Sequence, residues 1–148
     1  MKLEQQSTIS APRPDVWAVL QDVPRAAQMI PGVKDVMSLG DNKYSGTMQV
    51  GIGPMKMNLQ GDLTANPDPD NFEWKLEGHA QDKRLGGGIR VIVEAKIEEP
   101  ELGKSELSVS TDIQFIGRLG TLGQPLIRSK AKDQMKEFTK NLTKAVGG

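Results

Sequence analysis

The last thirty or so residues, 118–146, constrain the fold of this chain most. Their apolar side chains recur at steps of three and four residues, which is typical of one face of an amphipathic α-helix. At ~1.5 Å per residue such a helix is about 40 Å long, the length of a strand of roughly ten to twelve residues. We therefore expect a long C-terminal helix that covers a whole sheet. The apolar face comprises Leu119, Leu122, Leu126, Ile127, Ala131, Met135, Phe138, Leu142 and Val146.

The rest of the chain is patterned to supply that sheet. A first strand is expected over 2–10, followed by two short helices over 11–20 and 22–29, with Asp22 as a candidate N-cap of the second. From residue 33 onwards, apolar and polar residues alternate with a period of two, and turn-forming residues interrupt the pattern. Six further strands are expected at 33–39, 44–50, 55–63, 72–79, 89–97 and 107–115, with a loop at 66–71.

Clean alternation predicts antiparallel strands with one apolar and one polar face. We expect an α+β fold in one domain, 1–148. A curved seven-stranded antiparallel sheet wraps around the long C-terminal helix, two short helices separate strands 1 and 2, and an apolar cavity lies between sheet and helix. Inward-facing Gly46, Gly61 and Gly78 either leave room there or bend the sheet. Pro125 should kink the long helix or displace its start.

Composition excludes several classes of function. Nineteen basic residues balance nineteen acidic ones, so no global field favours nucleic acid. The chain has no cysteine and one histidine, His79, on the expected polar face, which argues against thiolate or multi-histidine metal sites. Neither a signal peptide nor a membrane-spanning apolar run is recognisable, so a cytoplasmic location is expected.

Several short motifs, weak individually, carry a resemblance in their order and spacing. They are Ala11-Pro12, Val16-Trp17 with Leu20 and Asp22, Ile30-Pro31-Gly32, Gly40-Asp41 before Tyr44, Val50 followed by Gly53-Pro54, Gly61, Gly86-Gly87-Gly88, and Gly117-Arg118-Leu119-Gly120. Together they resemble the CoxG family of carbon monoxide dehydrogenase subunits. That family is part of the helix-grip (START/SRPBCC) superfamily, which includes START lipid-transfer domains and the birch-pollen allergen.

The resemblance implies a non-enzymatic accessory protein of a molybdenum hydroxylase. It also implies binding of a hydrophobic molecule, such as a lipid or a quinone carried between membrane and enzyme. No covalent cofactor is expected. The implied partners are that small molecule, the hydroxylase and the inner face of the cell membrane.

Apolar positions on the inward face are the candidate ligand-binding residues. The alternative is that they form an ordinary core, which is the usual role of an apolar stripe. The candidates are Met29, Ile30, Met48, Val50, Met57, Leu59, Trp74, Leu76, Phe115, Leu119, Leu122 and Leu126.

Two other functions remain open at this point. A ligand-free module that recruits an enzyme to the membrane would have a filled core. An enzyme such as a cyclase or lyase would need inward ionisable residues, of which the expected inward face holds almost none. For membrane contact, we expect an apolar lip of Met29, Ile30 and Leu85, assisted by helix cations such as Lys132 and Lys136.

Overall fold

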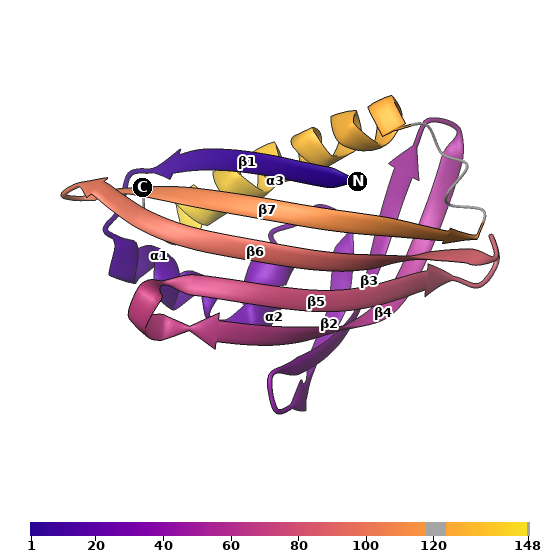
Figure 1. Ribbon diagram of the computed structural model, residues 1–148, viewed down its shortest axis with the longest axis horizontal. Helices are drawn as coiled ribbons and strands as arrows, with labels where there is room; N and C mark the ends of the chain where they lie inside the picture. The colour runs from indigo at the N-terminus through magenta and orange to yellow at the C-terminus, as the bar shows by residue number, and fades with distance from the viewer. Residues whose placement is uncertain (118–123, 148) are drawn as a thin grey trace.

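The computed structural model describes residues 1–117 and 124–147 and has the predicted α+β architecture (Figure 1). Seven strands form one antiparallel sheet in the order β1-β7-β6-β5-β4-β3-β2. The three α-helices of the described residues lie on the same side of this sheet, behind it in the view of Figure 1. The elements are β1 (Lys2–Ile9), α1 (Arg13–Leu20), α2 (Val23–Ala27), β2 (Val33–Gly40), β3 (Lys43–Ile52), β4 (Met55–Asp68), the 3₁₀ turn η1 (Pro69–Asn71), β5 (Glu73–Asp82), β6 (Gly87–Glu101), β7 (Lys104–Gly117) and α3 (Gln124–Ala145).

Strands β2 to β6 each pair with the next strand along the chain, which gives a meander that ends at β7. The first strand instead pairs with the last, in a register that runs from Lys2 opposite Asp112 to Ile9 opposite Ser105. This long-range pair places β1 at the edge of the sheet beside β7, and α3 follows β7 in the chain.

The expected loop at 66–71 is shorter than its turn-forming residues suggest. Strand β4 continues to Asp68, which pairs with Glu73 of β5, so that η1 and Phe72 alone reverse the chain. Strand pairing therefore overrides the local preference of these residues for a turn.

Both short helices are confirmed. The Asp22 carboxylate accepts a hydrogen bond from the Arg25 backbone N–H at 3.4 Å, so Asp22 caps α2 as predicted. Pro125 is the second residue of α3, in the first turn, where its missing N–H needs no intrahelical partner. Two candidate ligand residues, Leu119 and Leu122, lie outside the described residues.

The inward glycines do not line the cavity, and at Gly61 two strands approach each other closely. A Cβ atom at Gly61 would overlap the carbonyl oxygen of His79 and lie 2.6 Å from the Cα atom of Ala80. Strands β4 and β5 therefore approach too closely at this point for any side chain. Of the two roles predicted for these glycines, that of leaving room in the cavity is not supported, because Gly46, Gly61 and Gly78 are absent from its lining.

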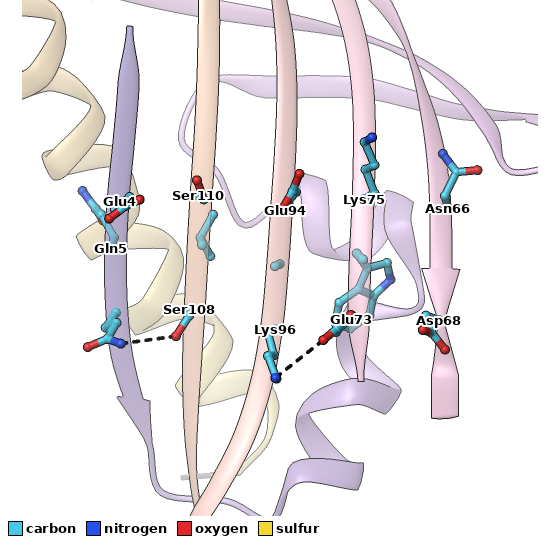
Figure 2. A pocket seen from close by; sticks show the side chains of 14 residues that line it. Glu4, Gln5, Asn66, Asp68, Glu73, Lys75, Glu94, Lys96, Ser108 and Ser110 are labelled. Carbon is cyan, nitrogen blue, oxygen red and sulfur yellow. Dashed lines mark hydrogen bonds and ion pairs between the residues drawn. The ribbon is translucent and has the colours of Figure 1, made fainter. Parts of the chain in front are cut away.

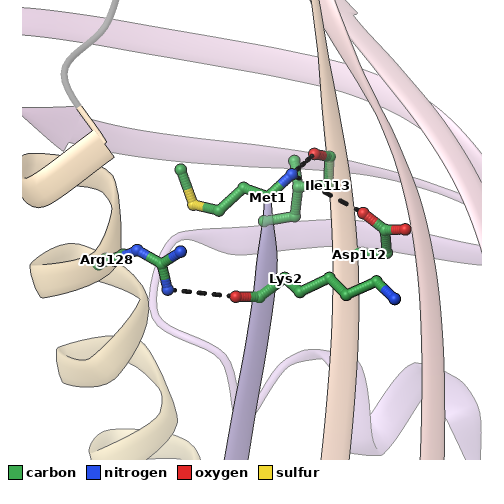
Figure 3. Close-up of polar contacts among 5 residues, drawn as sticks. All are labelled: Met1, Lys2, Asp112, Ile113 and Arg128. Atoms are coloured by element: carbon green, nitrogen blue, oxygen red, sulfur yellow. Dashed lines mark hydrogen bonds and ion pairs between the residues drawn. The ribbon is translucent and has the colours of Figure 1, made fainter.

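Helix α3 is held against β1 by polar contacts at two levels. At the start of β1, the Arg128 guanidinium donates to the Lys2 carbonyl oxygen at 3.1 Å, next to the Met1 amino group that donates to the Ile113 carbonyl (Figure 3). Further along, the Ser7 and Thr139 hydroxyl oxygens are hydrogen-bonded at 3.0 Å. These contacts fix the position of α3 along β1.

Candidate ligand-binding site

A cavity of about 370 Å³ lies between the concave face of the sheet and the helices. Its walls come from β1, β3 to β7, both short helices and α3. The lining residues are Leu3, Gln5, Leu20, Val23, Ala26, Ala27, Ile30, Met48, Leu63, Trp74, Leu76, Val93, Ala95, Leu107, Val109, Thr111, Ile113, Ala131, Gln134, Met135 and Phe138.

This lining is apolar apart from three residues, Gln5, Thr111 and Gln134. The described wall contains no ionisable side chain, and therefore no side chain suited to general acid or base catalysis. Such a wall can bind an apolar molecule out of water and can offer that molecule a few neutral hydrogen-bonding groups.

Four predicted residues lie on the cavity wall: Ile30, Met48, Trp74 and Leu76. They come from the segment after α2, from β3 and from β5, and strand alternation was sufficient to place the last three on the inner face. Their binding of a ligand remains a prediction.

Five other candidates lie elsewhere in the core. Met29 packs against a buried cluster that includes Val16 and Leu142. The remaining four belong to a second cluster near the β3–β4 turn, which Ile127 helps to close; they are Val50, Met57, Leu59 and Phe115. Alternation predicts which face a residue occupies, but not how far along the strand the cavity extends.

Leu126 also differs from the prediction. Its side chain is 52% exposed, and the neighbouring Ile127 is buried in its place. Successive residues on a helix are rotated by about 100°, so only one of two adjacent apolar residues can face the sheet. The cavity side of α3 consists of Ala131, Gln134, Met135 and Phe138, none of which was among the predicted ligand residues.

Two of the seven methionines, Met48 and Met135, line the cavity wall. Met55 and Met57 belong to the second cluster. Leu85 packs against that second cluster as well, so Met29, Ile30 and Leu85 do not form one lip.

The outer face of the sheet carries a larger hollow, about 940 Å³, that is open to solvent. Two rows of polar side chains border it, and ion pairs such as that between Lys96 and Glu73 at 3.6 Å cross it (Figure 2). Mixed, solvated charges on the polar face of a sheet are an ordinary outer surface. We therefore regard the smaller apolar cavity as the candidate site.

His79 is on this polar outer face, as predicted. Its side chain is 66% exposed, and Nε2 lies 4.0 Å from an Asp62 carboxylate oxygen. Within residues 1–117 and 124–147, no group of three or more histidine, aspartate or glutamate side chains is arranged to hold a metal ion.

Asp82 is a buried carboxylate, 2% exposed, at the end of β5. It accepts backbone hydrogen bonds from Asn58 at 2.9 Å, Arg84 at 3.0 Å and Leu85 at 3.1 Å. These bonds, that from Asn58 first, lower the pKa of Asp82 below its ordinary value and outweigh the opposing effect of burial. Asp82 thus fastens the β5–β6 turn to β4.

Comparison with known proteins identifies the family. The model of the carbon monoxide dehydrogenase CoxG family matches residues 6–147. The chain belongs to the CoxG family. CoxG proteins are accessory subunits, so family and fold together support a ligand-binding accessory role in general terms. A comparison with curated protein sequences finds no match.

Solved structures similar to this CoxG-family chain show its helix-grip, START-like fold. A conserved protein from Geobacillus kaustophilus superposes with a TM-score of 0.89 at 18% identity, covering 99% of this chain and 95% of that one. A START superfamily protein from Mycobacterium smegmatis has a TM-score of 0.70 at 12% identity, covering 99% and 97%. The ZhuI aromatase/cyclase from Streptomyces sp. R1128 has a TM-score of 0.64 at 16% identity, covering 99% and 90%. The fold is thus shared with an aromatase/cyclase, and the fold alone does not decide the activity of a protein that has it.

Proposed function

We propose that this chain binds a lipid or a quinone in the cavity beneath α3 and serves a molybdenum hydroxylase such as carbon monoxide dehydrogenase as a non-enzymatic accessory protein. In this role it links the enzyme to the membrane or to the quinone pool. The observation that carries the proposal is the apolar cavity of about 370 Å³, in a chain of the CoxG family.

The size of the cavity supports occupation by a ligand. Ligand pockets in proteins are typically apolar and a few hundred Å³ in volume, and this cavity has both properties. A ligand-free recruitment module would have a filled core, so a cavity of this size argues against that alternative.

The aromatase/cyclase neighbour favours an enzyme as the second candidate. The apolar lining argues against it, since the described wall has no ionisable side chain that could move a proton.

Membrane association is part of the proposal. Within the described residues, no helix has both the length and the hydrophobicity to span a bilayer.

Native mass spectrometry of the protein purified from its own host is the direct test. We expect a co-purifying lipid or quinone of matching mass. A matched pair of variants tests whether the ligand binds in the cavity. Ala131→Leu adds bulk to the cavity wall, whereas Ala18→Leu adds the same bulk to the exposed side of α1. Loss of the bound mass from Ala131→Leu alone supports the site. Retention in both variants, or a ligand-free wild-type protein, contradicts the proposal.

A further inference from the structure

Gln134 is one of the three polar side chains on the cavity wall. A ligand without a polar group would offer it no hydrogen-bonding partner. Its amide oxygen Oε1 is buried, and no group within the described parts of the chain lies at hydrogen-bonding distance from it. A buried amide oxygen that has lost water without gaining a partner is unfavourable. Such a group favours a partner that arrives with a ligand, once rotation about the last side-chain torsion turns the terminal amide toward the cavity.

The contacts of α3 with β1 show what lies beside Gln134. Arg128 bonds to Lys2 at one level, and Thr139 bonds to Ser7 at another. The helical segment between these levels rises about 16 Å, and the strand segment extends about 16 Å. Helix α3 and strand β1 therefore run side by side in the same direction.

This arrangement brings Gln134 level with Gln5. Gln134 is about 9 Å along the helix from Arg128, and Gln5 is about 10 Å along the strand from Lys2. Both side chains line the cavity, as does Thr111 on the adjoining strand β7. The three polar residues of the lining thus gather on the β1–β7 side of the cavity, and the rest of the wall is apolar.

We propose that Gln134 binds the hydroxyl group of an amphipathic ligand whose apolar body fills the remainder of the cavity. The proposal rests on the proposed function and narrows its ligand class. Because a hydroxyl group both donates and accepts, it can pair with either end of the amide. Gln5 and Thr111 are placed to complete its hydrogen bonds, and Trp74 and Leu76 contact the apolar body.

Isothermal titration calorimetry with two matched probes tests this proposal. 2-Naphthol carries a hydroxyl group, whereas 2-methoxynaphthalene has the same ring system and cannot donate. We compare the ratio of their dissociation constants in the wild-type protein and in Gln134→Leu, so that differences in probe hydrophobicity cancel. In the variant, the affinity for 2-naphthol relative to 2-methoxynaphthalene should fall about five- to tenfold, which is the effect of losing one hydrogen bond.

Met135→Leu is the matched control, because it changes a neighbouring wall residue without altering hydrogen bonding. It should leave the ratio unchanged, and a similar shift in this control would overturn the assignment to Gln134. Without ligand, Gln134→Leu should melt at or above the wild-type temperature, since it removes an unpaired buried atom. A lower melting temperature would mean that the amide is already paired and would overturn the proposal.

The remaining outcomes separate this proposal from the proposed function. If both probes bind the wild-type protein and Gln134→Leu leaves their ratio unchanged, the role of Gln134 is refuted while the carrier function stands. If neither probe binds the wild-type protein, the carrier function fails, and the role of Gln134 fails with it.

Discussion

Trp17 of α1 stacks on Trp74 of β5, with ring centroids 3.8 Å apart and planes inclined by 23°. Phe72 meets the Trp17 ring edge-on at 5.5 Å, and the Arg13 guanidinium lies 4.2 Å above the centroid of Phe72. Trp74 also lines the cavity and is 7% exposed. This aromatic column therefore connects the first helix to the wall of the proposed binding site.

Tryptophan fluorescence should report ligand binding through Trp74. The chain has two tryptophans, so Trp17→Phe isolates the emission of Trp74 and Trp74→Phe isolates that of Trp17. Decylubiquinone should quench Trp74 saturably in the first variant and Trp17 more weakly in the second, because Trp17 is absent from the cavity lining. Trp74 emission that does not respond at saturating quinone would contradict the placement.

Trp74→Ala should destabilise the protein, but less than a tryptophan deletion in a closed core. The substitution removes stacking worth ~0.5–1.5 kcal/mol together with the contacts of the ring. A closed core would lose ~3–5 kcal/mol, and one side of Trp74 faces the cavity. Urea denaturation measures the loss. A loss in the closed-core range, with an unchanged quinone response, would indicate an ordinary core residue.

Asn141→Ala should accelerate ligand exchange. The Asn141 side-chain amide donates to the Met29 carbonyl oxygen at 2.9 Å and thereby joins α3 to the chain just before Ile30 of the cavity wall. Helix α2 has no buried residue, so this bond of ~0.5–1.5 kcal/mol is a substantial part of what holds that wall. Stopped-flow quenching should show several-fold faster release, whereas the exposed-site control Lys140→Ala should match the wild-type rate.

Ile30→Asp should weaken liposome binding and quinone extraction at every salt concentration. A lipid or a quinone leaves the bilayer at the lowest free-energy cost where the cavity contacts the lipid, since each CH₂ group exposed to water costs ~0.8 kcal/mol. Lys132→Glu, on the exposed side of α3, should weaken binding mainly at low salt, where surface charge is poorly screened. Co-sedimentation across a salt series measures both effects, and wild-type binding by Ile30→Asp would refute this mode of contact.

Asp82 should make the stability of the fold sensitive to acid. Its pKa is lower in the folded protein than the ~3.9 of an unfolded aspartate. Unfolding therefore takes up a proton, and the stability that Asp82 contributes is present above pH ~4 and lost as pH falls through its folded pKa. Calorimetric melts should show this decline in the wild-type protein. Asp82→Asn should melt lower at neutral pH and show a smaller decline, and identical pH profiles would contradict the assignment.

Local patterns in the sequence were sufficient to predict the elements and their faces. The alternation around Met48 and Trp74 depends only on the two-residue repeat of a strand, and it placed both side chains inside. The period of the last helix likewise identified its buried stripe, including Leu142. Asp22 and Pro125 marked helix ends because capping and the missing proline N–H are local effects.

Only the tertiary structure decided where the cavity lies. The pairing of β1 with β7 joins segments at opposite ends of the chain, and no local period encodes it. At Gly61 the backbones of β4 and β5 approach too closely for a side chain, and no local period encodes this contact between strands. Gln134 lies in a predicted helix, but its unpaired amide became visible only once α3 was positioned along β1. Periodicity follows from the geometry of one segment, whereas a cavity is the volume that all the packed segments together leave unfilled.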